Sequence, residues 1–296
     1  MGKEESPTQT EKIPPLMGRA FDLSLRPASR LTWVGAGWAA VCGSLAADAL
    51  RLDQDTVVKL ALVLVLADPV LGAVWTTLPG LRQASPTRLS QGDDQPAVSM
   101  ADLLEIGVLY ALALLLGVVL GPGVAVVVAV GLFLPLVVWF ATGRYPLRNG
   151  WMCALLEIGV SWTIGLTAFT SLPEVISEGI AGLILSAVYW AGANAPALLA
   201  GLLLVLAYYG QLTLDQPLLF VTRRAVVTLP QFGVVALLVA RREPILAGAV
   251  AILVFAQMLF QPYLGRHHIR WYLRTTQWFF MGVMLLTAVG IASWGQ

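Results

Sequence analysis

The chain has 296 residues, of which 58% are hydrophobic and only 12% are charged, and its formal net charge is +1. A soluble domain carries about 25% charged residues, because its surface has to be solvated. The composition therefore excludes an ordinary soluble globular protein and predicts an all-α, polytopic transmembrane helical bundle. The near-neutral charge gives no reason to expect nucleic acid as a partner.

Residues 1–24 are polar and rich in proline, and they predict a disordered cytoplasmic tail. Residues 25–296 carry the apolar segments and are expected to form a single transmembrane helical domain. The two cysteines, Cys42 and Cys153, lie in apolar surroundings without a nearby histidine. They are therefore expected to act as packing residues, and no metal site is expected from them.

The rest of the chain contains many apolar segments of about the 20 residues that cross a bilayer. A Gly-Pro-Gly sequence at 121–123 predicts a tight hairpin between the third and fourth of them. We expect membrane spans over Leu31–Leu50, Val57–Leu78, Leu103–Leu120, Val124–Thr142, Trp151–Ser171, Pro196–Leu214, Ala225–Ala240, Leu246–Tyr263 and Thr275–Trp294.

A further apolar piece, Gly179–Ala193, is short for a span. The excess of Lys and Arg in cytoplasmic loops can decide its place. If this piece crossed the membrane, Arg223, Arg224 and the basic cluster 266–274 would lie outside. If it does not cross, they lie inside, and only Arg241 and Arg242 lie on the wrong side. We therefore expect about nine spans in the cell membrane with a cytoplasmic N-terminus, and an interfacial or re-entrant helix over 179–193.

Ionisable residues inside membrane spans are candidates for function. Asp68, followed by Pro69, lies in the second expected span, and Glu157 lies in the fifth. Each carboxyl group could face a cavity or could bond to a neighbouring helix, and the sequence leaves both interpretations open. The scarcity of such residues argues against a proton- or ion-coupled carrier, which normally shows several of them along a path.

Five short stretches share a pattern with one known family. They are Leu25-Arg26-Pro27, the Trp-Ala-Ala-Val-Cys-Gly run at 38–43, the Arg-Tyr-Pro-Leu-Arg-Asn-Gly-Trp run at 144–151, Trp-Thr-Ile-Gly at 162–165, and Thr-Leu-Pro-Gln at 228–231. Together they resemble the UbiA superfamily of membrane prenyltransferases, within it the chlorophyll and bacteriochlorophyll synthase branch. The resemblance implies nine transmembrane helices and an active site that faces the cytoplasm.

The resemblance also implies two Asp-rich motifs that hold Mg²⁺ on the diphosphate of a prenyl donor. The chain departs from this pattern. The first motif would fall at 76–83, where no carboxylate is present, and the nearby Asp93 and Asp94 lack helical spacing. The second would fall near Asp215, which stands alone. The usual Mg²⁺-diphosphate chemistry is therefore not expected, and Mg²⁺ would be required only if the chain is catalytic.

The favoured interpretation is a UbiA-type scaffold that binds a chlorophyll-type pigment, a quinone, an isoprenoid lipid or a membrane-protein partner such as a photosynthetic complex. An active prenyltransferase that attaches a phytyl- or geranylgeranyl-type chain to a tetrapyrrole is the first alternative, and a small membrane transporter is the second. Expected ligand-binding residues are Asp68, Arg82, Arg88, Arg148, Asn149, Trp151, Trp162, Asp215, Arg223 and Gln231.

Overall fold

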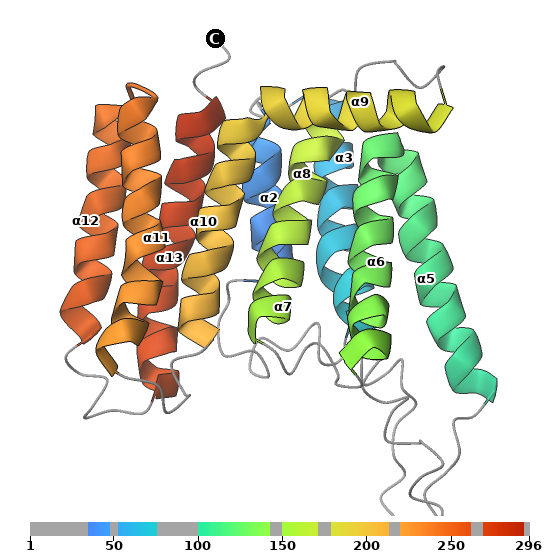
Figure 1. Cartoon of the computed structure of the whole chain (residues 1–296), viewed down its shortest axis with the longest axis horizontal. Coiled ribbons are helices and arrows are strands. Elements are labelled where there is room, and N and C mark those ends of the chain that lie inside the picture. Colours follow the sequence, from blue (N-terminus) through green and yellow to red (C-terminus); the bar gives the residue numbers. More distant parts are fainter. Residues whose placement is uncertain are drawn as a thin grey trace, which may run out of the picture.

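The computed structural model describes residues 35–47, 53–75, 100–142, 150–170, 179–212, 220–261 and 269–292 (Figure 1). Regular structure in these ranges is entirely helical, in 10 helices. The all-α prediction is thereby confirmed for this part of the chain. The expected tail over 1–24 lies outside the described residues.

Two of the helices contain a π-helical turn, in which the backbone bonds run from i to i+5. In chain order the elements are α2 (Ala36–Ala46), α3 (Gln54–Val65) with the π-turn η1 (Leu66–Val70) and a further turn to Trp75, α5 (Met100–Leu120), α6 (Pro122–Thr142), α7 (Gly150–Ala154) with the π-turn η4 (Leu155–Val160) and α8 (Ser161–Phe169), α9 (Gly179–Ala193), α10 (Ala195–Leu212), α11 (Phe220–Ala240), α12 (Pro244–Phe260) and α13 (Ile269–Ala292).

All these helices except α9 run along one common direction, and successive ones alternate between up and down (Figure 1). Helix α9 lies crosswise over the upper ends of the bundle. It is tied there by a hydrogen bond from the indole Nε1 of Trp190 to the hydroxyl of Thr170, at 2.9 Å. This crosswise orientation agrees with the interpretation of 179–193 as a helix that does not cross the membrane.

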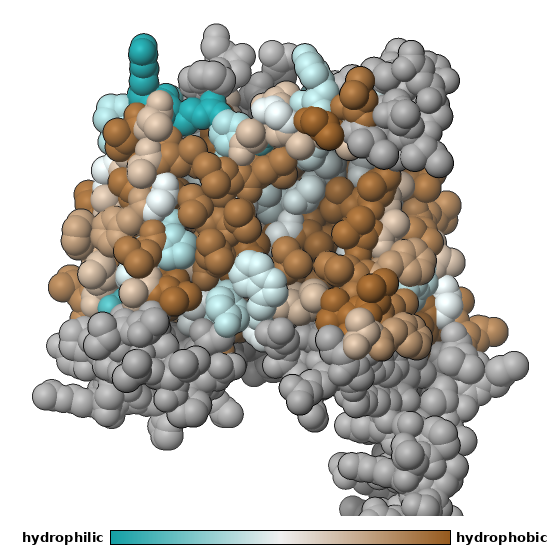
Figure 2. Space-filling view, viewed as in Figure 1, coloured by the Kyte–Doolittle hydropathy of each residue, from teal (hydrophilic) through white to brown (hydrophobic). Residues whose placement is uncertain are grey.

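Four of the described helices are long and apolar enough to span a bilayer: Gln54–Trp75, Gly150–Phe169, Ala195–Leu212 and Trp271–Ala292. Several shorter apolar helices accompany them. The lateral surface is covered by exposed large apolar side chains, such as Val118, Phe140 and Ile252, and Figure 2 shows this surface as a broad hydrophobic belt. These features identify a multi-pass membrane protein whose belt associates with the lipid bilayer.

The centre of the bundle is the contact between α2 and α8, which belong to both of its large apolar clusters. Two glycines allow the backbones to touch. A Cβ on Gly165 would lie 2.0 Å from the carbonyl oxygen of Ala40, and a Cβ on Gly43 would lie 2.0 Å from that of Trp162. Small residues at such crossings are the usual basis of close helix packing in membranes.

The expected hairpin between the third and fourth segments is confirmed, and a single residue forms it. Helix α5 ends at Leu120 and α6 begins at Pro122. Gly121 between them has φ +135, a value that favours glycine, and its N–H donates to the carbonyl of Gly117 at 3.1 Å. Proline at the first helical position costs no hydrogen bond, because that N–H has no partner within the helix.

Several helices begin earlier than hydropathy predicts. Helix α3 begins at Gln54, where the Asp53 carboxylate accepts from the Thr56 N–H at 2.8 Å and caps the helix. Helix α13 begins at Ile269 and not at Thr275. Its first turns carry arginines and aromatic residues, which lower the hydropathy without breaking the helix, because such side chains suit a membrane interface.

The turn between α11 and α12 contains the one non-glycine residue with positive φ among the described residues, Arg242 at φ 63. Its N–H donates to the carbonyl of Val239, and the N–H of Glu243 donates to that of Leu238, which is the pattern of a Schellman cap. Because glycine adopts this conformation without a Cβ penalty, Arg242→Gly should stabilise the fold by about 1 kcal/mol.

The measurement is the apparent melting temperature in detergent micelles. Arg242→Ala serves as the control, because it removes the same charge and keeps the Cβ. An equal rise for both variants would assign the effect to the charge and contradict the conformational explanation.

Candidate functional site

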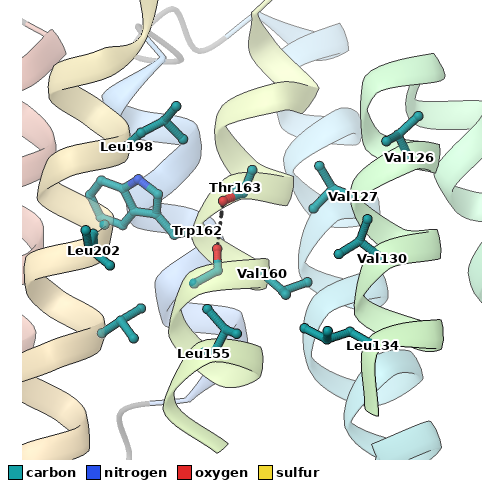
Figure 3. A pocket seen from close by; sticks show the side chains of 13 residues that line it. Val126, Val127, Val130, Leu134, Leu155, Val160, Trp162, Thr163, Leu198 and Leu202 are labelled. Atoms are coloured by element: carbon teal, nitrogen blue, oxygen red, sulfur yellow. Dashed lines mark hydrogen bonds between the residues drawn. The ribbon is translucent and has the colours of Figure 1, made fainter. Parts of the chain in front are cut away.

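One candidate site is a groove on the side of the bundle, between α6 and α10, with a volume of about 320 Å³. Helix α6 forms one wall, α10 forms the other, and the η4–α8 segment forms the floor (Figure 3). Exposed valines and leucines stand on both walls, so that the groove faces the lipid side of the protein. Its lining residues are Val126, Val127, Val130, Leu134, Leu155, Gly159, Val160, Trp162, Thr163, Leu198, Gly201, Leu202 and Val205.

Trp162 holds the floor of the groove against α10. Its side chain is 1% exposed, and its indole Nε1 donates to the carbonyl of Ala197 at 3.0 Å. Gly201 makes room for the ring, because a Cβ there would lie 2.8 Å from the Cδ1 atom of Trp162. A tryptophan opposite a glycine thus fixes the separation between α8 and α10.

The groove offers a ligand almost no free hydrogen-bonding group. Thr163 points into it, and its hydroxyl already donates to the carbonyl of Gly159 at 2.8 Å (Figure 3). The Trp162 N–H is likewise bonded to the backbone of α10. With these two polar groups occupied, the lining recognises hydrocarbon by shape and by dispersion contacts.

The two carboxyl groups inside spans both lie in π-turns. Asp68 is in η1, beside Pro69, whose missing N–H interrupts the ladder and accounts for the wide turn. The half-buried side chain of Asp68 packs against α2, since a Cβ on Gly37 would lie 3.2 Å from the Asp68 Cβ. Glu157 is in η4 and accepts a hydrogen bond from the Tyr208 hydroxyl at 2.7 Å.

These two carboxyl groups lie at a similar depth. Asp68 is seven residues before Trp75, and Glu157 is seven residues after Gly150, and both helix ends lie at the end of the bundle away from α9 (Figure 1). At 1.5 Å per residue, each is about 10 Å from that end. For Glu157 the structure shows bonding to a neighbouring helix, which was one of the two interpretations left open by the sequence.

The structure places the expected site residues in different surroundings. Trp162 is a groove residue, whereas Trp151 lies half-buried and makes an edge contact with the ring of Tyr209, at 5.6 Å between centroids. Gln231 is buried on α11, where its Nε2 donates to the carbonyl of Val227 at 2.9 Å. Arg223 lies on α11, but its side chain is outside the described part, as are the residues Arg82, Arg88, Arg148, Asn149 and Asp215.

Within the described residues, no three His, Cys, Asp or Glu side chains gather into a metal-binding group. Asp93, Asp94 and Asp215 lie outside that part of the chain, so that the expectation of no metal site stays a prediction. Comparison with known families, curated proteins and solved structures finds no match to this chain. The UbiA resemblance therefore rests on the short stretches named above.

The structure adds residues that the sequence interpretation did not select. Gly159 and Gly201 shape the groove, and Tyr208 bonds the Glu157 carboxylate. The sequence feature that could have indicated the groove is a glycine on each of two expected spans together with a nearby tryptophan. That signal does not say which face of each helix meets the other, and for this reason the pairing could not be predicted.

Proposed function

We propose that this protein is a UbiA-type membrane scaffold that binds the hydrocarbon chain of an isoprenoid, a quinone or a chlorophyll-type pigment in the groove between α6 and α10. The observation that carries the proposal is the apolar lining of the groove on the lipid-facing side of the bundle. An amphiphilic lipid could enter such a groove sideways from the bilayer, without passing through water.

The shape of the groove favours a chain over a broad ring system. The lining residues of α6 extend from Val126 to Leu134, a rise of eight residues, which is about 12 Å at 1.5 Å per residue. On η4–α8 they extend from Leu155 to Thr163, also a rise of eight residues. The groove thus runs parallel to the helices, as a lipid chain in the surrounding bilayer does.

The proposed topology has nine crossings, a cytoplasmic N-terminus and an interfacial α9 on the opposite side. Its support is that the arginine-containing segments 76–99, 143–149 and 262–268 connect helix ends that lie away from α9 (Figure 1). Placing these segments in the cytoplasm agrees with the positive-inside rule, to which Arg241 and Arg242 in the α11–α12 turn are exceptions. The two half-buried carboxyl groups, Asp68 and Glu157, then lie nearer to the cytoplasmic side.

The proposal is tested by filling the groove. Val130 stands on its wall and is 52% exposed, so that Val130→Trp should fold and occlude the space. We expect the variant to lose most of a lipid that co-purifies with the original protein, as measured by mass spectrometry and by the absorption spectrum after purification in mild detergent. The loss should be about tenfold or more, as expected when bulk replaces a ligand's apolar contacts.

Val118→Trp is the matched control, because Val118 is 64% exposed on α5 and lies outside the groove. Equal lipid retention in the two variants would overturn the groove as the binding site. The same preparations, given an allylic diphosphate, Mg²⁺ and a chlorophyllide, test the prenyltransferase alternative. Turnover that a chelator abolishes would show that the protein is a metal-dependent prenyltransferase and would overturn the proposal of a binding scaffold.

A further inference from the structure

The four C-terminal helices contain buried glutamines that do not line the groove, and only Gln231 among them belongs to a stretch that carries the UbiA resemblance. One stands on each helix: Gln211 on α10, Gln231 on α11, Gln257 on α12 and Gln277 on α13. Their side chains are only 0–3% exposed. Because a buried amide costs free energy unless it is hydrogen-bonded, four of them inside one apolar unit require an explanation.

Contacts between neighbouring helices relate the levels of these glutamines along the bundle. The rings of Tyr208 and Phe280 stack at 6.2 Å between centroids, and Gln211 and Gln277 lie three residues below them on antiparallel helices. A Cβ on Gly282 would lie 2.8 Å from the Cδ1 atom of Leu253, which brings Gln257 level with Gln277 to within about one residue.

The rings of Phe232 and Phe255 lie 5.7 Å apart, and this contact brings Gln231 level with Gln257. The contacts between α10 and α11 complete the set and show that it is tilted relative to the helix axes. Gly210 faces Val226, and Leu203 faces Gly233, so that Gln231 lies about six residues, or about 9 Å, above Gln211. We call these four residues the glutamine layer; it slopes across α10–α13 in the half of the bundle away from α9.

Several amide atoms of this layer have no hydrogen-bond partner in the part of the protein that the structure describes. Among the described residues, both amide atoms of Gln211, both of Gln257 and the Oε1 of Gln231 have no hydrogen-bond partner. These unpartnered atoms include donors on nitrogen and acceptors on oxygen, and none carries a charge. A buried group of this kind is normally satisfied by water or by a bound molecule of matching polarity.

We propose that the glutamine layer is a second, polar binding site, which takes a small uncharged molecule with both hydrogen-bond donors and acceptors, such as water or a hydroxyl- or amide-bearing solute. The absence of a charge on the four amides disfavours ions, because an ion without a counter-charge is very costly at this depth. The proposal is independent of the groove, which lies on α6, α8 and the other face of α10.

The test is the reactivity of engineered cysteines towards small thiol reagents, in a background where Cys42 and Cys153 are replaced by alanine and serine. Gln257→Cys reports on the layer, and Val250→Cys, also 0% exposed on α12 and two turns away, is the matched control. The thiolate is the reactive species and forms only where water or a polar group can take the proton, so that Gln257→Cys should react about tenfold faster or more.

Equal rates at the two positions would overturn the site. If Gln257→Cys does not yield folded protein, the same comparison is made on α10, between Gln211→Cys and its control Leu204→Cys. Both of these positions are buried. Comparing a hydroxyethyl with a trimethylammonium-ethyl methanethiosulfonate tests the ligand class. The uncharged reagent should react faster, whereas equal rates with the cationic reagent would contradict the restriction to uncharged molecules.

Discussion

Gly165→Ala should be among the most destabilising single-methyl additions in this protein. The new Cβ would lie 2.0 Å from the Ala40 carbonyl oxygen and 2.7 Å from the Ser44 nitrogen, and both atoms belong to the backbone of α2. Neither can rotate away, so that α2 and α8 have to separate. We expect a loss of about 3 kcal/mol, at the upper end of what overpacking costs, measured as a fall in apparent melting temperature in detergent.

Gly248→Ala is the control for this change. Gly248 lies on α12, and a Cβ there meets nothing within 4 Å. Alanine is the better helix former, so that Gly248→Ala should be neutral or should stabilise by about 0.5–1 kcal/mol. A similar loss of stability in the two variants would show that the α2–α8 contact is not as close as described.

Trp162→Ala is expected to reduce both stability and lipid binding. The indole is 1% exposed, separates α8 from α10 and forms part of the groove floor. Its removal leaves a cavity and breaks the bond to Ala197, for which the expected cost is about 3–5 kcal/mol. Thermal unfolding in detergent and the amount of co-purified lipid measure the two effects on one sample.

Two further variants separate packing from hydrogen bonding. Trp162→Phe keeps most of the volume and loses the N–H, so that it should cost only about 1 kcal/mol and should retain the lipid. Trp278→Ala removes an indole that is 59% exposed on α13 and should change stability by less than about 0.5 kcal/mol. If Trp278→Ala destabilises as much as Trp162→Ala, the special role assigned to Trp162 is wrong.

The fold was predictable to the extent that hydropathy and local breakers determine it. Long apolar runs marked the helices, Gly121 marked the hairpin, and the basic residues separated the short piece 179–193 from the spans. Helix ends were less accurate, because arginines and aromatics at the start of α13 belong to the helix and to the membrane interface together.

The groove could not be predicted for a different reason. Its walls come from three stretches that are distant in the sequence, and valines such as Val126 look the same whether they face a groove or open lipid. The π-turn at Asp68 had a local cause in Pro69, whereas η4 contains no proline and leaves no comparable mark in the sequence. The level of the glutamine layer likewise depends on how α10–α13 pack against one another.

The crosswise placement of α9 decides on which side of the membrane the last helix ends. If all 10 helices crossed the membrane, the last one would end on the side on which the first one begins. With α9 lying over the ends, α2 and α13 run in the same direction, and α13 finishes on the α9 side (Figure 1). Under the proposed topology, the segment before α2 and the segment after α13 therefore meet different compartments, and a soluble partner that needs both could not reach them from one side of the membrane.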